Sequence, residues 1–269
     1  MSHSNPHLSM TSNGCMYGQV GTVNQVFNQF DPSSRCSCCP RPSDHLSRKP
    51  GAHVHLNSLL EPVVDASWDR NRSISPPDST CIPGTRKELI SRIASRVDCL
   101  HEPERIFWLY GYVGCGKSAI AHTLSKDFAR QKGKLAGSFV FFRYSDERSR
   151  MGKLAATLAS QIAVAIPSTE VYIREAITVT PHIAAPTTSL EMQLEHLIFS
   201  PLRLAFSTGM PHAISEPHIV VIDGLDECGD PQAVGEFLDH MLLFFRDNLD
   251  IPLRLLIASR VEEHIRTHL

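Results

Sequence analysis

One octapeptide combines the residue types that phosphate binding needs. It reads GYVGCGKS, from Gly111 to Ser118, and has the form G-x-x-x-x-G-K-[ST]. A triphosphate needs several donors that converge on its oxygens, and backbone N–H groups supply them only where glycines let the chain curl tightly. The lysine adds a positive charge at the β and γ oxygens, and the serine hydroxyl is a ligand for Mg²⁺. The pattern predicts a phosphate-binding loop (P-loop).

The elements around the octapeptide are those that the motif requires, a strand before it and a helix after it. Residues 105–110 (RIFWLY) predict a short buried strand, and apolar residues recur at helical spacing from Lys117 to about Gln131. The unpaired N–H groups and the positive dipole end of that helix would point at the phosphates. We therefore expect nucleotide contacts from a run of consecutive residues: Gly111, Tyr112, Val113, Gly114, Cys115, Gly116, Lys117, Ser118 and Ala119.

A second motif supplies acids. Residues 218–227 read HIVVIDGLDE, an apolar run that predicts a buried strand and ends in Asp223. Open α/β sheets bind ligands at the carboxyl ends of their strands. Asp223 would hold Mg²⁺ there, through water, together with Ser118. Asp226 or Glu227 would orient or deprotonate the attacking water. The alternatives, a glycine turn and a solvated acidic turn without a ligand, do not explain why both motifs occur in one chain.

Two further features concern the nucleotide. Arg260 follows the strand predicted at residues 253–259 (LRLLIAS), where it would lie beside the γ-phosphate and sense it. The catalytic candidates are therefore Asp226, Glu227 and Arg260. The sequence downstream of the loop has no [NT]-K-x-D motif, which would read guanine, and this favours ATP over GTP. The predicted cofactors are ATP and Mg²⁺.

Strands and helices alternate along residues 80–269. Buried strands are predicted at 105–110, 135–143, 218–223 and 253–259, with helical stretches between them, one of which is expected to open at Thr187 or Thr188. Such alternation implies a parallel sheet that is covered on both faces. The predicted fold is α/β, a P-loop NTPase three-layer sandwich with a mainly parallel sheet flanked by helices.

Residues 1–79 differ in composition. They are rich in Ser, Pro, His and Asn, and we predict a low-complexity, largely disordered N-terminal segment. Residues 19–30 could form a short strand or nothing. Zinc binding by Cys36, Cys38 and Cys39 with nearby histidines is disfavoured, because their spacing fits no common zinc finger.

The first helix of the ordered region is predicted to start at Thr85. Thr85 would be its N-cap, with Glu88 at the capping-box position. Leu89, Ile93 and Val97 form the apolar side of this helix, and its arginines and lysine predict a solvated basic face that includes Arg86.

Composition excludes several classes of partner. The net charge is -2 and the pI is near 6.7, which indicates no bulk attraction to nucleic acid or to anionic membranes. No apolar run has the length of a membrane span, and the N-terminus has no secretory signal. The eight cysteines are interpreted as reduced thiols, and we expect a cytoplasmic protein.

Residues from about 80 to 269 resemble a NACHT-type NTPase module. More narrowly, they resemble the nephrocystin-like N-terminal P-loop domain of large fungal multidomain (STAND-class) proteins. The matching segments are CIPGTRKELISRI, FWLYGYVGCGKSAIAHTL, GSFVFFR, HIVVIDGLDEC and LRLLIASR. Gly224 matches the small residue that these families place after the metal aspartate, and Asp226 the acid three positions on. Many other P-loop ATPases have a second acid directly after the first.

The resemblance implies a signal-transduction ATPase that acts as a nucleotide-dependent switch, with slow ATP hydrolysis. Such proteins carry a winged-helix or helical segment after the core, followed by sensor repeats. The sequence ends at Leu269, soon after Arg260. We therefore expect a truncated, repeat-less form in which the elements that close the pocket are missing. Homo-oligomer or protein contacts would be reached through those missing repeats.

Two other functions share the phosphate loop. A non-hydrolysing nucleotide-binding interaction fragment would follow if the missing elements were needed for turnover. A small-molecule or nucleotide kinase would need an arginine-bearing lid between its later strands. The candidate lid at residues 145–150 (SDERSR) comes too early, and the DGLDE segment is unlike those of kinases.

Overall fold

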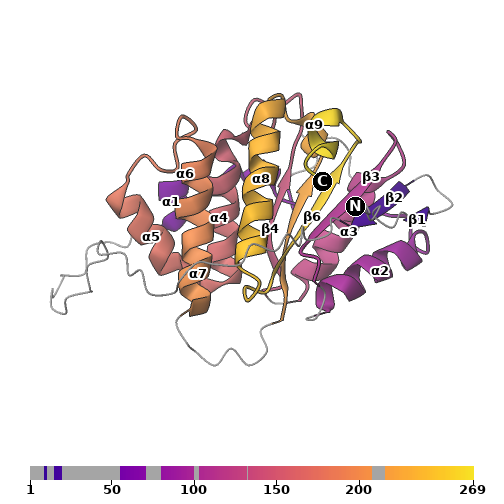
Figure 1. Ribbon diagram of the computed structural model, residues 1–269, viewed down its shortest axis with the longest axis horizontal. Helices are drawn as coiled ribbons and strands as arrows, with labels where there is room; N and C mark the ends of the chain where they lie inside the picture. The colour runs from indigo at the N-terminus through magenta and orange to yellow at the C-terminus, as the bar shows by residue number, and fades with distance from the viewer. Residues whose placement is uncertain are drawn as a thin grey trace, which may run out of the picture.

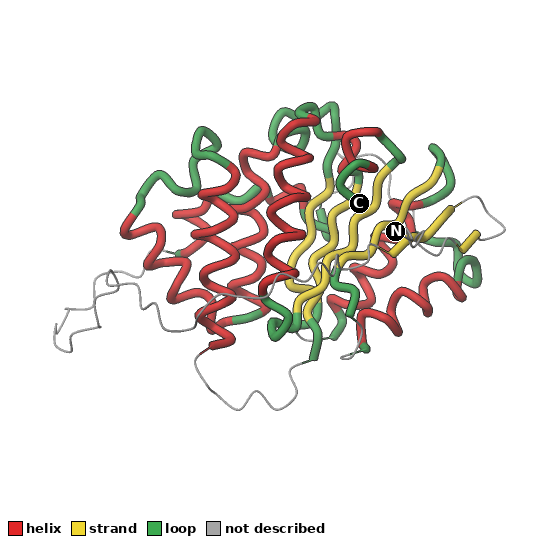
Figure 2. Tube along the Cα trace, viewed as in Figure 1, coloured by secondary structure: helices red, strands yellow, loops and turns green. Residues whose placement is uncertain are grey.

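A parallel sheet forms the centre of the molecule (Figures 1 and 2). The computed structural model describes residues 9–10, 15–19, 55–70, 80–99, 103–131, 133–207 and 216–269. The order of the parallel strands is β3-β6-β5-β4. Their bounds are β3 Ile106–Gly111, β4 Leu135–Val140, β5 His218–Asp223 and β6 Leu253–Ser259. Two short strands, β1 Ser9–Met10 and β2 Cys15–Gln19, continue the sheet antiparallel beyond β3.

The register of the sheet brings three strand ends together. Tyr110 of β3 lies opposite Ser259 of β6, and Asp223 of β5 lies opposite Ala258 of β6. The residues that follow these strands therefore emerge at the same edge, although they are far apart in the sequence. β6 separates the strand that leads into the P-loop from the strand that carries Asp223.

Helices cover both faces of the sheet. α2 (Lys87–Asp98) and α3 (Lys117–Ala129) share one apolar cluster with alternate strand residues such as Leu109, Val221 and Leu256. The intervening strand residues, such as Trp108, Ile222 and Leu255, point to the other face of the sheet and belong to a larger apolar cluster. That cluster is covered by α4 Leu154–Ala165, α5 Glu170–Val179, α6 Leu190–Leu194, α7 Ser200–Ser207 and α8 Pro231–Asp247.

The predicted α/β fold with a mainly parallel, helix-flanked sheet is confirmed. Side chains of a strand alternate between its two faces, so strands that are covered on both sides read as continuous apolar runs. Figure 1 shows α4 to α8 on one side of the sheet and α2 and α3 on the other. The short α9 (Glu263–Arg266) contacts α8.

Helix starts differ from the sequence prediction in two places. Thr85 does not cap α2, because its hydroxyl donates to the carbonyl of Ile82 at 2.7 Å and Arg86 is the N-cap residue. The helix expected to open at Thr187 or Thr188 begins at Leu190, where the hydroxyl of Ser189 accepts from a backbone N–H. It continues through a short π-helix, Glu195–Phe199, into α7.

Part of the N-terminal segment is ordered, in contrast to the disorder predicted for residues 1–79. α1 (Leu56–Leu60) and a 3₁₀ turn (Val64–Ala66) bury Leu56, Leu60, Val63 and Ala66 in the larger cluster. These four side chains lie in a short stretch, residues 56–66, which the composition of residues 1–79 as a whole does not reveal. Almost all of the segment at residues 19–30, and Cys36, Cys38 and Cys39, lie outside the described residues.

Among the residues that the structure describes, no helix combines the length and the apolar character that crossing a membrane requires.

Candidate functional site

The P-loop connects the end of β3 to the start of α3. Gly114 and Gly116 have φ values of 77° and 90°, in the left-handed region that residues with a Cβ rarely adopt. α3 begins at Lys117, and its N-cap, Gly116, makes no side-chain capping hydrogen bond. The first N–H groups of a helix have no partner within the helix. The start of α3 therefore has the open N–H groups that favour anions at helix N-termini.

The side chain of Arg86 contacts the backbone of the P-loop. Its Nη2 donates to the carbonyl of Cys115 at 2.6 Å, and a Cβ built on Gly116 would lie 2.3 Å from its Nη1. Arg86 itself has a φ of 55°, which is uncommon for a residue other than glycine. The expected solvated basic face is wrong for this residue. Helical periodicity could not identify it, because Arg86 precedes the helix.

Lys117 contacts the backbone of its own loop. Its Nζ donates to the carbonyl of Gly111 at 2.9 Å and to that of Tyr112 at 3.1 Å. The Sγ of Cys115 lies 3.9 Å away. These contacts hold the ammonium group at the loop.

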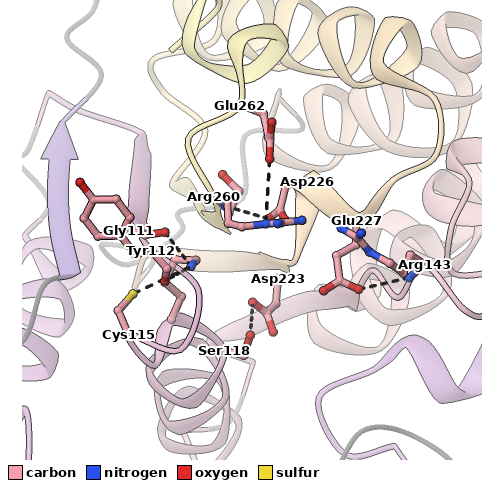
Figure 3. A network of polar contacts seen from close by, with 12 residues as sticks. Gly111, Tyr112, Cys115, Ser118, Arg143, Asp223, Asp226, Glu227, Arg260 and Glu262 are labelled. Carbon is pink, nitrogen blue, oxygen red and sulfur yellow. Dashed lines mark hydrogen bonds and ion pairs between the residues drawn. The ribbon is translucent and has the colours of Figure 1, made fainter.

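Ser118 and Asp223 meet across 105 positions of sequence. The hydroxyl of Ser118 donates to Oδ1 of Asp223 at 3.1 Å. Figure 3 shows the two side chains pointing toward one another from α3 and the end of β5. Burial raises the pKa of Asp223 from 3.8 to about 6, although the Ser118 hydrogen bond and the charge of Arg70 act in the opposite direction.

This pair fits a magnesium ion. Mg²⁺ prefers oxygen ligands and uses one or two protein groups, with water and phosphate completing its shell. A hydroxyl and a buried carboxylate are such a set, and burial of Asp223 leaves a carboxylate that a cation would stabilise. Within the described parts of the chain, no group of three or more His, Cys, Asp or Glu side chains could hold a metal.

Asp226 is engaged by Arg260. Its Oδ1 accepts the backbone N–H of Arg260 at 2.8 Å, and its Oδ2 accepts from Nε at 2.7 Å. Asp226 is buried, with 5% of its side chain exposed, and Glu262 lies 4.0 Å from the same guanidinium. The hydrogen bond to Asp226 raises the pKa of Arg260, which therefore stays charged. The structure places both predicted residues together at the sheet edge (Figure 3).

Glu227 has a different environment. Its Oε2 accepts the backbone N–H of Arg143 at 3.2 Å. Gly224 precedes Asp226 and Glu227 in the sequence and has a φ of 70°. A Cβ at this position would come within 3.1 Å of the carbonyl oxygen of Phe141. This close approach explains why a glycine follows Asp223.

Two cavities lie on either side of the Ser118–Asp223 pair. The first, of about 350 Å³, is lined by Lys117, Gly114 and Arg260 among others. The second, of about 400 Å³, contains Trp68, Arg70 and His122. Ser118, Asp223 and Glu227 line both cavities. Trp68 and Arg70 were missed by sequence reasoning, because they lie in the segment predicted to be disordered and belong to no motif.

The sheet, the loop and the strand-end aspartate define a P-loop α/β protein. More specifically, the chain belongs to the family described as Nephrocystin 3, N-terminal, whose model matches residues 84–260. A search of curated proteins finds no match for this chain. The matched residues include the P-loop, Asp223 and Arg260, whereas Trp68 and Arg70 precede them.

Proposed function

We propose that this chain is a nucleotide-dependent switch of the NACHT type, which binds ATP with Mg²⁺ and hydrolyses the ATP slowly. The contact between Ser118 and Asp223 carries the proposal. It joins a hydroxyl at the start of a helix to a buried carboxylate at the end of a strand, directly beside Lys117. Two oxygen ligands, a lysine and open helix N–H groups together suit a magnesium triphosphate.

Each residue has a defined task in this proposal. The N–H groups of the P-loop and the ammonium of Lys117 bind the β- and γ-phosphates, while Arg86 fixes the loop from its other side. Ser118 and Asp223 hold the metal. When bound, Mg²⁺ would neutralise negative charge that develops on the phosphate oxygens.

The two acids after Asp223, Asp226 and Glu227, have different roles in this proposal. Both oxygens of Asp226 are used by Arg260, so Asp226 positions the arginine beside the γ-phosphate. Glu227 accepts one backbone hydrogen bond and lines both cavities. We assign to Glu227 the orientation of the attacking water. The nucleotide is ATP, because the sequence has no [NT]-K-x-D motif.

Switching, assembly with further copies or protein partners, and a cytoplasmic location complete the proposal. They rest on the resemblance of the sequence to NACHT-type modules.

Substitution of the P-loop lysine tests nucleotide binding. We expect Lys117→Ala to weaken binding of a fluorescent ATP analogue by about a hundredfold or more, since a charge-assisted contact to phosphate is lost. Lys126→Ala is the matched control, because Lys126 is an exposed lysine in the last turn of the same helix. Equal affinities for the wild type and the Lys117 variant would refute the proposed site.

A nucleotide-binding protein without turnover is the second candidate. It is favoured by the engagement of Asp226, which leaves one acid for the water. Phosphate release by the wild type no faster than by Lys117→Ala, combined with tight ATP binding, would establish it.

A further inference from the structure

A segment outside the matched domain forms one wall of the candidate site. We call residues 61–70 the N-terminal strap. It is anchored at two points: the N–H of Val63 donates to Oγ1 of Thr157 on α4, and the N–H of Trp68 donates to Oγ of Ser138 on β4, both at 3.0 Å. Val63 and Ala66 are buried between these anchors. The strap is therefore part of the folded domain.

Ion pairs and a ring contact fix the strap further. Asp65 lies 3.4 Å from Nε of Arg148, and Glu61 lies 3.3 Å from Nζ of Lys153. The ring of Trp68 lies 5.9 Å from that of His122 on α3, the helix that starts at the P-loop. The position of the strap is thus tied to the helix that would bind the phosphates.

Arg70 is the charged group that the strap brings to the site. It shares the 400 Å³ cavity with Ser118, Asp223 and Glu227. The same three residues line the cavity on the P-loop side, which contains Lys117. Arg70 and Lys117 therefore line two different cavities that share Ser118, Asp223 and Glu227.

The charges favour an anionic ligand at this position. Burial lowers the pKa of Arg70, and the carboxylates of Asp223 and Asp65 oppose this shift. An arginine guanidinium keeps its charge in proteins, so Arg70 is a cation close to Asp223. A metal ion bound to Asp223 would replace Arg70 as the counter-ion of that carboxylate. The planar guanidinium would then direct its donors to phosphate oxygens, which it binds in pairs.

We infer that Arg70 is a third cationic ligand of the triphosphate, supplied in cis by the N-terminal strap and directed at the terminal phosphate. The terminal phosphate is selected because Arg70 shares its cavity with the metal pair and Glu227, the groups at the hydrolysed end of the nucleotide. The inference rests on the proposed nucleotide site. It adds a ligand that lies outside the residues matched by the family.

The test compares ATP with ADP on the full chain. Fluorescent analogues of both are titrated with Mg²⁺ present against the wild type, Arg70→Gln and Arg130→Gln. Arg130 is the control because it is an exposed arginine at the far end of α3. We expect Arg70→Gln to weaken ATP-analogue binding about tenfold and ADP-analogue binding less than about threefold, since only ATP has the terminal phosphate. Arg130→Gln should change neither affinity.

Other outcomes overturn the inference. Equal losses for both nucleotides would show that Arg70 only supports the fold, and tighter ATP binding would show that it competes with Mg²⁺. Lys117→Ala should weaken both nucleotides, so an intact Lys117 effect with no Arg70 effect leaves the proposed function standing. A wild type that binds neither nucleotide refutes both.

A second variant guards against misfolding. If thermal unfolding shows that Arg70→Gln does not fold, Arg70→Lys keeps the charge without the paired donors. It should again weaken the ATP analogue more than the ADP analogue. Unchanged affinity for both analogues would contradict the inference.

Discussion

The two sides of the Ser118–Asp223 pair are built in different ways. On the P-loop side, one contiguous segment from Gly111 to Ser118 supplies the glycines, the lysine and the helix start, and the side chain of Arg86 contacts it. On the strap side, the wall is assembled from the strap, α3 and the ends of β4 and β5. The first side is local in sequence, so a motif reveals it. The second exists only when distant segments pack together.

The largest effect on nucleotide affinity is expected from a substitution that adds a carbon atom between the P-loop and Arg86. Gly116→Ala places a Cβ 2.3 Å from Nη1 of Arg86 at a φ of 90°. We expect loss of ATP-analogue binding by about a hundredfold or more, because both the backbone and the arginine must shift. Gly84→Ala is the control, since Gly84 has a φ of 92° and open space around its Cβ position.

Gly84→Ala should cost stability through backbone strain and leave nucleotide affinity near that of the wild type. Comparable losses of affinity in the two variants would show that the contact between the P-loop and Arg86 does not shape the site. Affinity is measured by titration, and stability by urea unfolding.

An intermediate effect, on stability, is expected from substitution of Asp223, which lines both cavities together with Ser118. The pKa of Asp223 is raised from 3.8 to about 6 in the folded protein, so its stabilising contribution is full below pH 3.8 and is lost as the pH rises through 6. Without nucleotide, Asp223→Asn should therefore be more stable than the wild type at pH 8, by on the order of 1–3 kcal/mol, and similar to it at low pH. Urea unfolding at several pH values measures this.

Added Mg²⁺ and ATP should reverse that order, because the ligand stabilises only a protein that can bind it. Asp146→Asn is the control, since Asp146 is exposed on the loop after β4. A wild type that stays less stable than Asp223→Asn at saturating Mg²⁺ and ATP would count against Asp223 as a metal ligand.

The smallest effect should come from one anchor of the strap. Thr157→Val removes the acceptor for the buried N–H of Val63, which should destabilise the protein by about 1–2 kcal/mol. Thr178→Val is the matched control, because Thr178 makes the same bond to the carbonyl four residues before it but is exposed. Hydrogen exchange should show faster opening of residues 61–70 in Thr157→Val alone. Equal exchange in both variants would mean that this anchor does not hold the strap.

Local rules explain what sequence reasoning predicted correctly. Continuous apolar runs predicted β3, β5 and β6, because strands that are covered on both faces need such runs. The carboxyl ends of parallel strands meet at one edge, so the sequence also placed Ser118, Asp223 and Arg260 in one region. The register of β6 with β3 and β5 agrees with this placement. The roles of these residues stay predictions until nucleotide binding is measured.

The same rules failed where a contact joins distant segments. Arg86 was assigned to a solvated helix face, yet its guanidinium contacts the carbonyl of Cys115. Asp226 and Glu227 are neighbours with similar side chains, and the sequence could not separate them. Their partners, Arg260 and the N–H of Arg143, come from the residue after β6 and from the loop after β4.

The sequence by itself determined the P-loop, the strand that ends in Asp223 and the α/β fold, because glycine conformation and side-chain periodicity act over a few neighbouring residues. Only the tertiary structure decided that Trp68 and Arg70, near the end of residues 61–70, line a cavity together with Ser118 and Asp223. The reason is physical: the buried apolar side chains and two hydrogen bonds that hold the strap have their partners on α4 and β4, more than 60 residues away.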